Sequence, residues 1–300
     1  MTVLSREFWQ DYLKDRIVFL LFLLVIFVSL PQPNLHLDVA SLIIVIATTL
    51  IVAEILYWTS GYPISETMMI LGMPLGLVGS AIGLVLVFGS YTLDPGNLSI
   101  ELMGTITSIM LLTVMYGLIL CVLGYMLRKQ QAKSAIALPI GIATFYFSLL
   151  IIFLAVASAM LLSQNIGVFY SPAPLFLSSG LVFLSLLARE NGRGPAECVA
   201  DASLAIIMLG ILISVVELYG SFGENQFNAF IEPQLFFNTA NFANYGMLYG
   251  ATLYIFSFLL SLRTGEIYGI NFKLRNWHML EAFSFYVFMT LAAPSLFSLV

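Results

Sequence analysis

The stretch "GLVGSAIGLV", residues 76–85, is too apolar for a water-facing loop and unusually rich in small residues for a buried helix. Gly72, Gly76 and Ser80 are spaced four residues apart, and so are Gly79 and Gly83. Because four residues make about one helical turn, these positions form strips along one helix that have no large side chains, which we call bare strips. The stretch therefore predicts a membrane helix that either packs very closely on a neighbour or lines a path.

The composition of the whole chain is that of an integral membrane protein. Of its 300 residues, 60% are hydrophobic and only 9% are charged, with a mean hydropathy of +1.01. A soluble domain carries about 25% charged residues. The net charge of -5 and the lack of a basic cluster with interleaved aromatic residues exclude a nucleic-acid partner. The two cysteines, Cys121 and Cys198, form no metal-ligand pattern, so we expect free thiols and no cofactor.

Nine apolar segments can be marked, most of which reach the ~20 residues that cross a bilayer. We therefore predict an all-α bundle of about nine spans, with boundaries near 12–30, 39–59, 68–92, 99–127, 135–163, 172–188, 199–219, 235–262 and 279–300.

The positive charges support this layout. All 11 Lys and Arg residues fall into four groups, and nine spans with a cytoplasmic start place every group on the inner side. The groups are Arg6, Lys14 and Arg16; Arg128, Lys129 and Lys133; Arg189 and Arg193; and Arg263, Lys273 and Arg275. The segments predicted outside, 31–38, 93–98, 164–171 and 220–234, contain no Lys or Arg. We expect a cytoplasmic N-terminus and an external C-terminus.

A possible internal repeat relates the two halves of the chain. "GSAIGLVLVFGS" (79–90) aligns without gaps to "GILISVVELYGS" (210–221), and "YGLILCVLGYMLRK" (116–129) resembles the segment from Tyr245 to Arg263. An even number of predicted spans separates the copies, so the repeat is parallel. This divides the chain into a four-span half (1–133), a four-span repeat (134–266), and an inner loop with a final span (267–300).

Two hydroxyls on the predicted third and fourth spans allow alternative interpretations. A threonine in a membrane helix commonly bonds the carbonyl one turn earlier, and small residues commonly serve helix packing. The functional alternative is that Thr113 faces Ser80 across a helix pair, so that both offer oxygens to a cation that loses its water.

These residues also carry a family resemblance. "GMPLGLVGSAIGLV" (72–85), followed by "DPGNL" and "LLTVMYGLIL", resembles the third and fourth membrane helices of the MotA/TolQ/ExbB proton-channel family over residues 72–128. That family has a proline, then G-x-x-G-T-x-x-G-L, a polar outer turn, and a threonine shortly before Tyr-Gly. By resemblance, Ser80, Thr113 and Tyr116 take ion-pathway positions. Gly72, Gly76, Gly79, Gly83 and Gly117 take helix-packing positions.

The resemblance implies a stator-like subunit of a motor complex in the bacterial inner membrane. Such subunits form a ring around single-span partners, each of which brings an intramembrane aspartate. The predicted third span agrees, because it has no carboxylate between Glu66 and Asp94.

The chain departs from the family pattern in several places. It has nine predicted spans instead of about four, no large domain before residue 68, and Pro74 one position late. In the ungapped alignment, the second copy has Ile211 for Ser80 and Phe242 for Thr113, which suggests a non-conducting copy near 199–263.

Three acidic residues fall within or at the edge of predicted spans, where buried charges are expensive and often functional. Glu54 and Glu217 are the possible intramembrane acids, and Glu281 lies at the edge of the ninth span. All three lie near a span end, where snorkelling to the interface lowers the cost.

Three functions remain open. The first is a stator-like ion-channel subunit that uses proton or sodium flow together with a carboxylate-bearing partner. The alternatives are a secondary transporter, for which a parallel repeat is natural, and a structural subunit of a membrane complex. An enzyme is the least favoured class, since "RENGRGPAECVAD" (189–201) lacks the ending of a phosphate loop.

The predicted topology can be tested with single cysteines at Asn97 and Gln130, which fall in an outer and an inner loop. An impermeant thiol reagent added to intact cells should label only Asn97→Cys. Labelling of both positions from one side would contradict the nine-span layout.

Overall fold

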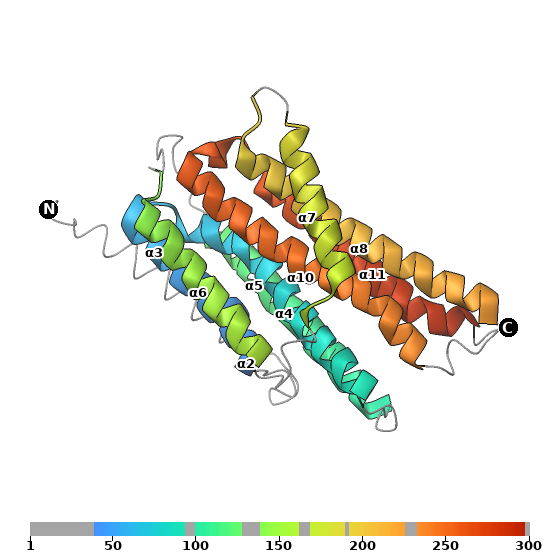
Figure 1. Cartoon of the computed structure of the whole chain (residues 1–300). Helices are drawn as coiled ribbons and strands as arrows, with labels where there is room; N and C mark the ends of the chain where they lie inside the picture. Colours follow the sequence, from blue (N-terminus) through green and yellow to red (C-terminus); the bar gives the residue numbers. More distant parts are fainter. Residues whose placement is uncertain are drawn as a thin grey trace, which may run out of the picture.

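The computed structural model describes residues 39–93, 100–127, 139–161, 169–189, 192–225 and 233–297, and every regular element in these ranges is helical (Figure 1). This confirms the all-α prediction for the described part of the chain. The first predicted span, 12–30, lies outside the described residues. The elements are α2 (Val39–Leu42), η2 (Ile43–Ala47), α3 (Thr48–Ser60), α4 (Ile64–Leu93), α5 (Ile100–Leu127), α6 (Ile142–Leu161), α7 (Pro172–Leu187), α8 (Pro195–Asn225), α10 (Pro233–Thr264), η5 (Glu266–Tyr268) and α11 (Phe272–Phe297).

Five described segments are long and apolar enough to cross a membrane. They are Ile43–Ser60, Ile64–Val85, Ile142–Leu161, Pro195–Glu217 and Asn241–Thr264. The apolar helices Leu111–Leu127 and Pro172–Leu187 are shorter. A helix rises 1.5 Å per residue, so about 20 residues cover the hydrocarbon thickness. The chain is therefore an α-helical membrane protein, whereas the full number of nine spans stays a prediction.

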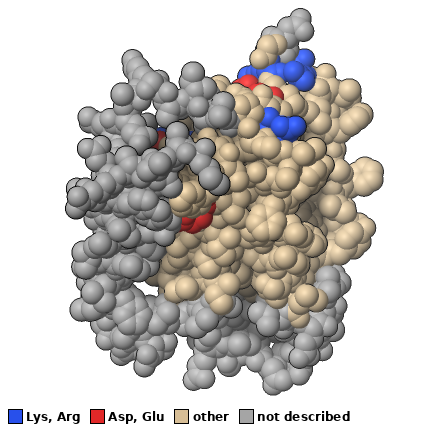
Figure 2. Space-filling view, turned by 90° about the vertical axis from the view of Figure 1, so that its left-hand side faces the viewer, with Lys and Arg blue, Asp and Glu red and all other residues tan. Residues whose placement is uncertain are grey.

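The described basic residues gather at one end of the bundle, which we call the basic end. It holds Arg189, Arg193, Arg263, Lys273 and Arg275, on or beside the turns that join α7 to α8 and α10 to α11. In Figure 2, the Lys and Arg visible on the displayed face lie at its upper end, with acidic residues among them. The layout of alternating up and down helices explains this gathering, because each second turn returns to the same end.

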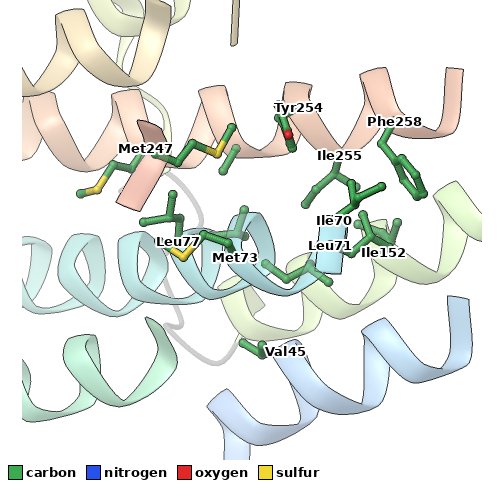
Figure 3. Packing of buried hydrophobic residues seen from close by; sticks show 14 of the residues in the cluster. Val45, Ile70, Leu71, Met73, Leu77, Ile152, Met247, Tyr254, Ile255 and Phe258 are labelled. Atoms are coloured by element: carbon green, nitrogen blue, oxygen red, sulfur yellow. The ribbon is translucent and has the colours of Figure 1, made fainter. Parts of the chain in front are cut away.

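Helix α4 lies at the centre of the bundle, between α5 and α10, with α3, α6 and α11 also in contact. Figure 3 shows Met73 and Leu77 of α4 directed toward Met247 of α10. Nearer the basic end, Ile70 and Leu71 of α4 meet Ile255 and Phe258 of α10 and Ile152 of α6. This apolar layer joins the two halves of the chain. The halves proposed from sequence therefore share one core.

Two helix pairs pack through glycine with their backbones in contact. In the pair α4–α5, a Cβ on Gly117 would lie 2.5 Å from the carbonyl oxygen of Gly72, and one on Gly76 would lie 3.0 Å from the carbonyl oxygen of Thr113. In the pair α8–α10, a Cβ on Gly210 would lie 2.9 Å from the Cα of Gly246. In lipid, small residues let helices approach and gain dispersion contact without a hydrophobic driving force.

The two pairs use equivalent contacts, in a register that differs from the ungapped sequence alignment. Gly76 lies against the carbonyl of Thr113 and the Cα of Gly117, and Gly210 lies against the carbonyl of Phe242 and the Cα of Gly246. Gly210 therefore corresponds to Gly76 and not to Gly79, a difference of about one helical turn.

In this packing register Ser214 is aligned with Ser80, whereas the ungapped sequence alignment pairs Ser80 with Ile211. The two registers differ by one turn, because short stretches of Gly, Ile, Leu and Val match almost equally well in neighbouring registers. Phe242 takes the place of Thr113 in both registers.

Gly117→Ala should destabilise the protein by about 1–3 kcal/mol, because the added methyl group must displace the backbone of α4. Gly180 of α7 is the matched control, since a Cβ there meets nothing within 4 Å. Gly180→Ala should be neutral or slightly stabilising, by up to about 1 kcal/mol. Unfolding in mixed micelles, followed by circular dichroism, checks both values. Equal stability of the two variants would contradict the close contact.

Candidate functional site

The predicted ion-pathway residues lie inside the chain. Ser80 and Thr113 are 0% exposed, and Tyr116 is buried as well. The residue of α4 against the Thr113 side chain is Gly79, whose added Cβ would lie 2.6 Å from the Thr113 Cγ2. Ser80 follows Gly79 and is turned about 100° around the helix from it. Its hydroxyl oxygen is buried and has no hydrogen-bond partner among the described residues.

The contact between α4 and α5 is too close to hold an ion at its glycine positions. Gly72 and Gly76 lie against the backbone of α5 around Gly117, with no room for even a methyl group. Gly79 is buried one turn further along, and Gly83 is partly buried. The bare strip on α4 therefore serves helix packing at these levels. Any path within this chain that includes Ser80 must run along another side of α4.

Helix α4 is enclosed by its own chain. In the most apolar stretch of Ile64–Val85, 94% of the residues are buried inside the chain. The corresponding share for Ile142–Leu161 of α6 is 28%. A membrane helix at the surface of a bundle leaves one face for lipid or a partner, and α6 does so. The described part of α4 leaves almost none, so the groups that surround Ser80 come largely from α5, α10 and other helices of the same chain.

Pro74 interrupts the hydrogen bonding of α4, and α11 compensates for it. Proline has no N–H, so the Ile70 carbonyl loses its usual donor one turn later. Asn276 of α11 donates from Nδ2 to this carbonyl at 3.2 Å and to that of Met69 at 2.8 Å. The Cys121 thiol of α5 also donates to the Met69 carbonyl, at 3.4 Å. Three helices thus meet at the interrupted turn of α4.

Sequence reasoning missed Asn276. Pro74 inside an apolar segment was the sequence feature that could have indicated such a residue. The carbonyl four residues before a proline has no N–H donor in its own helix, and in a membrane it must find a donor elsewhere. The sequence does not show which of the buried amides supplies that donor.

A second polar group lies further from the basic end, on α10. Asn244 is 0% exposed and accepts a hydrogen bond at Oδ1 from the Tyr286 hydroxyl of α11, at 3.4 Å. On the neighbouring residue, the Ala243 N–H donates to Ser214 Oγ of α8, at 2.7 Å. Polar side chains therefore link α10 to both α8 and α11 inside the apolar core.

Ion pairs fasten α11 at the basic end. Lys273 lies 2.8 Å from Glu66 of α4, and Arg275 lies 2.6 Å from Asp201 and 3.9 Å from Glu197, both of α8. All of these side chains are partly exposed, so each pair contributes about 1 kcal/mol or less. Their main effect is to fix the register of α11 across α4 and α8.

The suspected intramembrane acids are not buried. Glu54 is partly exposed and accepts a hydrogen bond from Trp58 Nε1 at 3.2 Å. Glu217 is exposed, and Glu281 is exposed with its Oε2 3.1 Å from His278 Nδ1. Among the Asp and Glu residues whose side chains the structure describes, none is fully buried, and no group of three His, Cys, Asp or Glu in the described residues could hold a metal ion.

Comparison with protein-family models, with curated proteins and with solved structures finds no match. The geometry described above therefore carries the functional argument, together with the short motif resemblance.

Asn276→Leu should destabilise the protein by about 1–3 kcal/mol, because two α4 carbonyls lose a donor in an apolar environment. Pro74→Ala restores a backbone N–H for the Ile70 carbonyl. In the Pro74→Ala background, Asn276→Leu should therefore cost clearly less. Mixed-micelle unfolding of the four proteins of this double-mutant cycle measures the difference. An identical cost in both backgrounds would show that Asn276 does not compensate for the proline.

Proposed function

We propose that the protein is an ion-conducting subunit of a membrane complex, similar in mechanism to the stator units of the MotA/TolQ/ExbB family. The observation that carries this proposal is the buried, unpartnered hydroxyl of Ser80 on the apolar central helix α4. A hydroxyl left without a partner in an apolar core costs free energy, which a functional requirement would explain.

The conducted ion is a proton or sodium, and its countercharge comes from outside α4. A cation that leaves water needs fixed oxygens and a negative charge to replace its hydration. Ser80 and Thr113 supply oxygens, but α4 has no carboxylate between Glu66 and Asp94. A single-span partner with an intramembrane carboxylate supplies the charge, and several copies of the chain assemble around it as a ring.

We further propose that the pairs α4–α5 and α8–α10 descend from one duplicated unit. Their equivalent glycine contacts support this, as does the agreement of Ser80 with Ser214 in the packing register. The second unit has lost the Thr113 hydroxyl at Phe242, which leaves the first unit as the conducting one.

A secondary transporter is the second candidate, and one observation favours it. Because α4 is enclosed by its own chain, a partner carboxylate reaches Ser80 only if neighbouring helices separate. A transporter needs no such partner, so the enclosure of α4 by its own chain favours this candidate.

Ion flux in vesicles distinguishes the two candidates. The complex purified by affinity through this chain should conduct protons or sodium, and the chain reconstituted alone should not. Ser80→Ala with Thr113→Val should reduce the flux of the complex far more than either change alone. Each lost hydroxyl removes about 1 kcal/mol of stabilisation from the same ion.

Ser203→Ala is the matched control. Ser203 is fully buried, but its hydroxyl bonds the Ala200 carbonyl of its own helix, at 2.7 Å. Its removal should leave the flux unchanged. Equal flux in the wild type and the double variant would remove support for the hydroxyl pathway, whereas flux from the chain alone would favour the transporter.

A further inference from the structure

Buried polar atoms without partners concentrate on three helices. Among the described residues, five such atoms have no hydrogen-bond partner: Ser80 Oγ of α4, Asn241 Oδ1 and Asn244 Nδ2 of α10, Asn276 Oδ1 of α11, and Ser148 Oγ of α6, which is the one outside these three helices. Ser80 and Asn244 are 0% exposed, and Asn276 is 8% exposed. A buried polar group without a partner costs about 1–3 kcal/mol, so three of them on adjoining helices indicate a shared partner.

Two of these groups lie at successive levels along one side of α4. Asn276 contacts α4 at Met69 and Ile70, close to the basic end. Further along, Met247 of α10 faces Met73 and Leu77, as Figure 3 shows. Asn244 lies one turn beyond Met247 on α10, which runs antiparallel to α4. The series therefore continues away from the basic end.

Helical periodicity places Ser80 in the same series. Ser80 follows Met73 by seven residues, so it lies within about 20° of the same direction and about two turns further along α4. Ser80 therefore lies between the direction of Gly76, which packs on α5 and is about 40° away, and that of Met73, which faces α10, at the level that Asn244 occupies. The Tyr286 hydroxyl bonds Asn244 Oδ1 there and brings α11 to the same level. We call Asn276, Asn244, Tyr286 and Ser80 the polar seam.

The chemistry of the polar seam suits water. Asn244 Nδ2 needs an acceptor, Asn276 Oδ1 needs a donor, and the Ser80 hydroxyl can use either. Water is the small partner that both donates and accepts, and ordered water commonly bonds buried polar groups in this way. Glu66 of α4 lies at the basic end, where it is paired with Lys273, and Glu281 of α11 is exposed. The seam therefore carries neutral groups between its ends.

We propose that water enters the bundle between α4, α10 and α11 and occupies the polar seam from Asn276 to Ser80. The water bridges Asn276, Asn244 and Ser80, so that the hydrated side of α4 lies next to the closed glycine contact with α5. The role of this water, which is to carry protons or solvate an ion, rests on the proposed function. Its presence is tested separately from any flux.

Reactivity of single cysteines in lipid vesicles tests the inference. In a background with Cys121→Ala and Cys198→Ala, the variants Ser80→Cys and Asn244→Cys are treated with methanethiosulfonate ethylammonium, a small water-soluble reagent. The cysteine thiolate attacks the reagent's sulfur, a disulfide forms and methanesulfinate leaves, and the thiolate forms only where water reaches the sulfur. Val78→Cys is the matched control, because Val78 is also 0% exposed on the same helix, on the side turned away from Met73.

Ser80→Cys should react at least about tenfold faster than Val78→Cys, since a dry apolar position suppresses the thiolate. Asn244→Cys should react at a similar rate to Ser80→Cys. If Asn244→Cys fails to fold, Ser80→Cys alone decides, because sulfur replaces oxygen there with little change in shape. Equal slow rates for Ser80→Cys and Val78→Cys would overturn the proposal, and so would equal fast rates, which report general opening of the bundle.

The labelling result is independent of the flux measurement. Fast labelling of Ser80→Cys without ion flux would establish the hydrated seam and refute the proposed function. Flux that depends on Ser80 without any labelling would refute the seam and leave the proposed function in place.

Discussion

The backbone contact between α4 and α5 is the interaction on which the rest of the structure depends. Gly72, Gly76 and Gly117 bring two membrane helices together without intervening side chains. In lipid, apolar side chains gain nothing by leaving their surroundings, so close packing and dispersion must hold helices together. The pair α8–α10 repeats this solution at Gly210 and Gly246. The large apolar side chains are thereby left for the layer between α4 and α10, which joins the two pairs.

This arrangement makes α4 the central helix and gives it a constraint that surface helices lack. An interrupted hydrogen bond on an enclosed membrane helix cannot be satisfied by water from the interface. The Ile70 carbonyl, which has no N–H donor at Pro74, is therefore bonded by Asn276 of α11. The ion pairs Lys273–Glu66 and Arg275–Asp201 hold α11 in the register that this bond requires. Partly exposed charges at the end of the bundle thus position a buried amide in its interior.

The two sides of α4 have different chemistry, which connects packing to the proposed function. Toward α5, the helix is closed by backbone contact, and a cation has no space at the glycine positions. Toward α10 and α11, the unpartnered atoms of Ser80, Asn244 and Asn276 interrupt an apolar core. The proposed ion path through Ser80 therefore runs beside the glycine contact and not through it. The resemblance to a channel family drew attention to Ser80, whose hydroxyl is buried on the central helix.

The sequence by itself determined that the chain is helical and membrane-embedded, since composition and segment length depend on no distant contact. It also showed that α4 has a bare face, because four-residue spacing is a local property of a helix. Only the tertiary structure decided what each face meets. Local periodicity gives the direction of a side chain but not the identity of its neighbour. Examples are the contact of Gly76 with Gly117 and the bond of Asn276 to α4, which join residues that are distant in sequence. Short apolar segments match one another in several registers with little difference in similarity. Only one of those registers lets the backbones approach at glycine in both helix pairs.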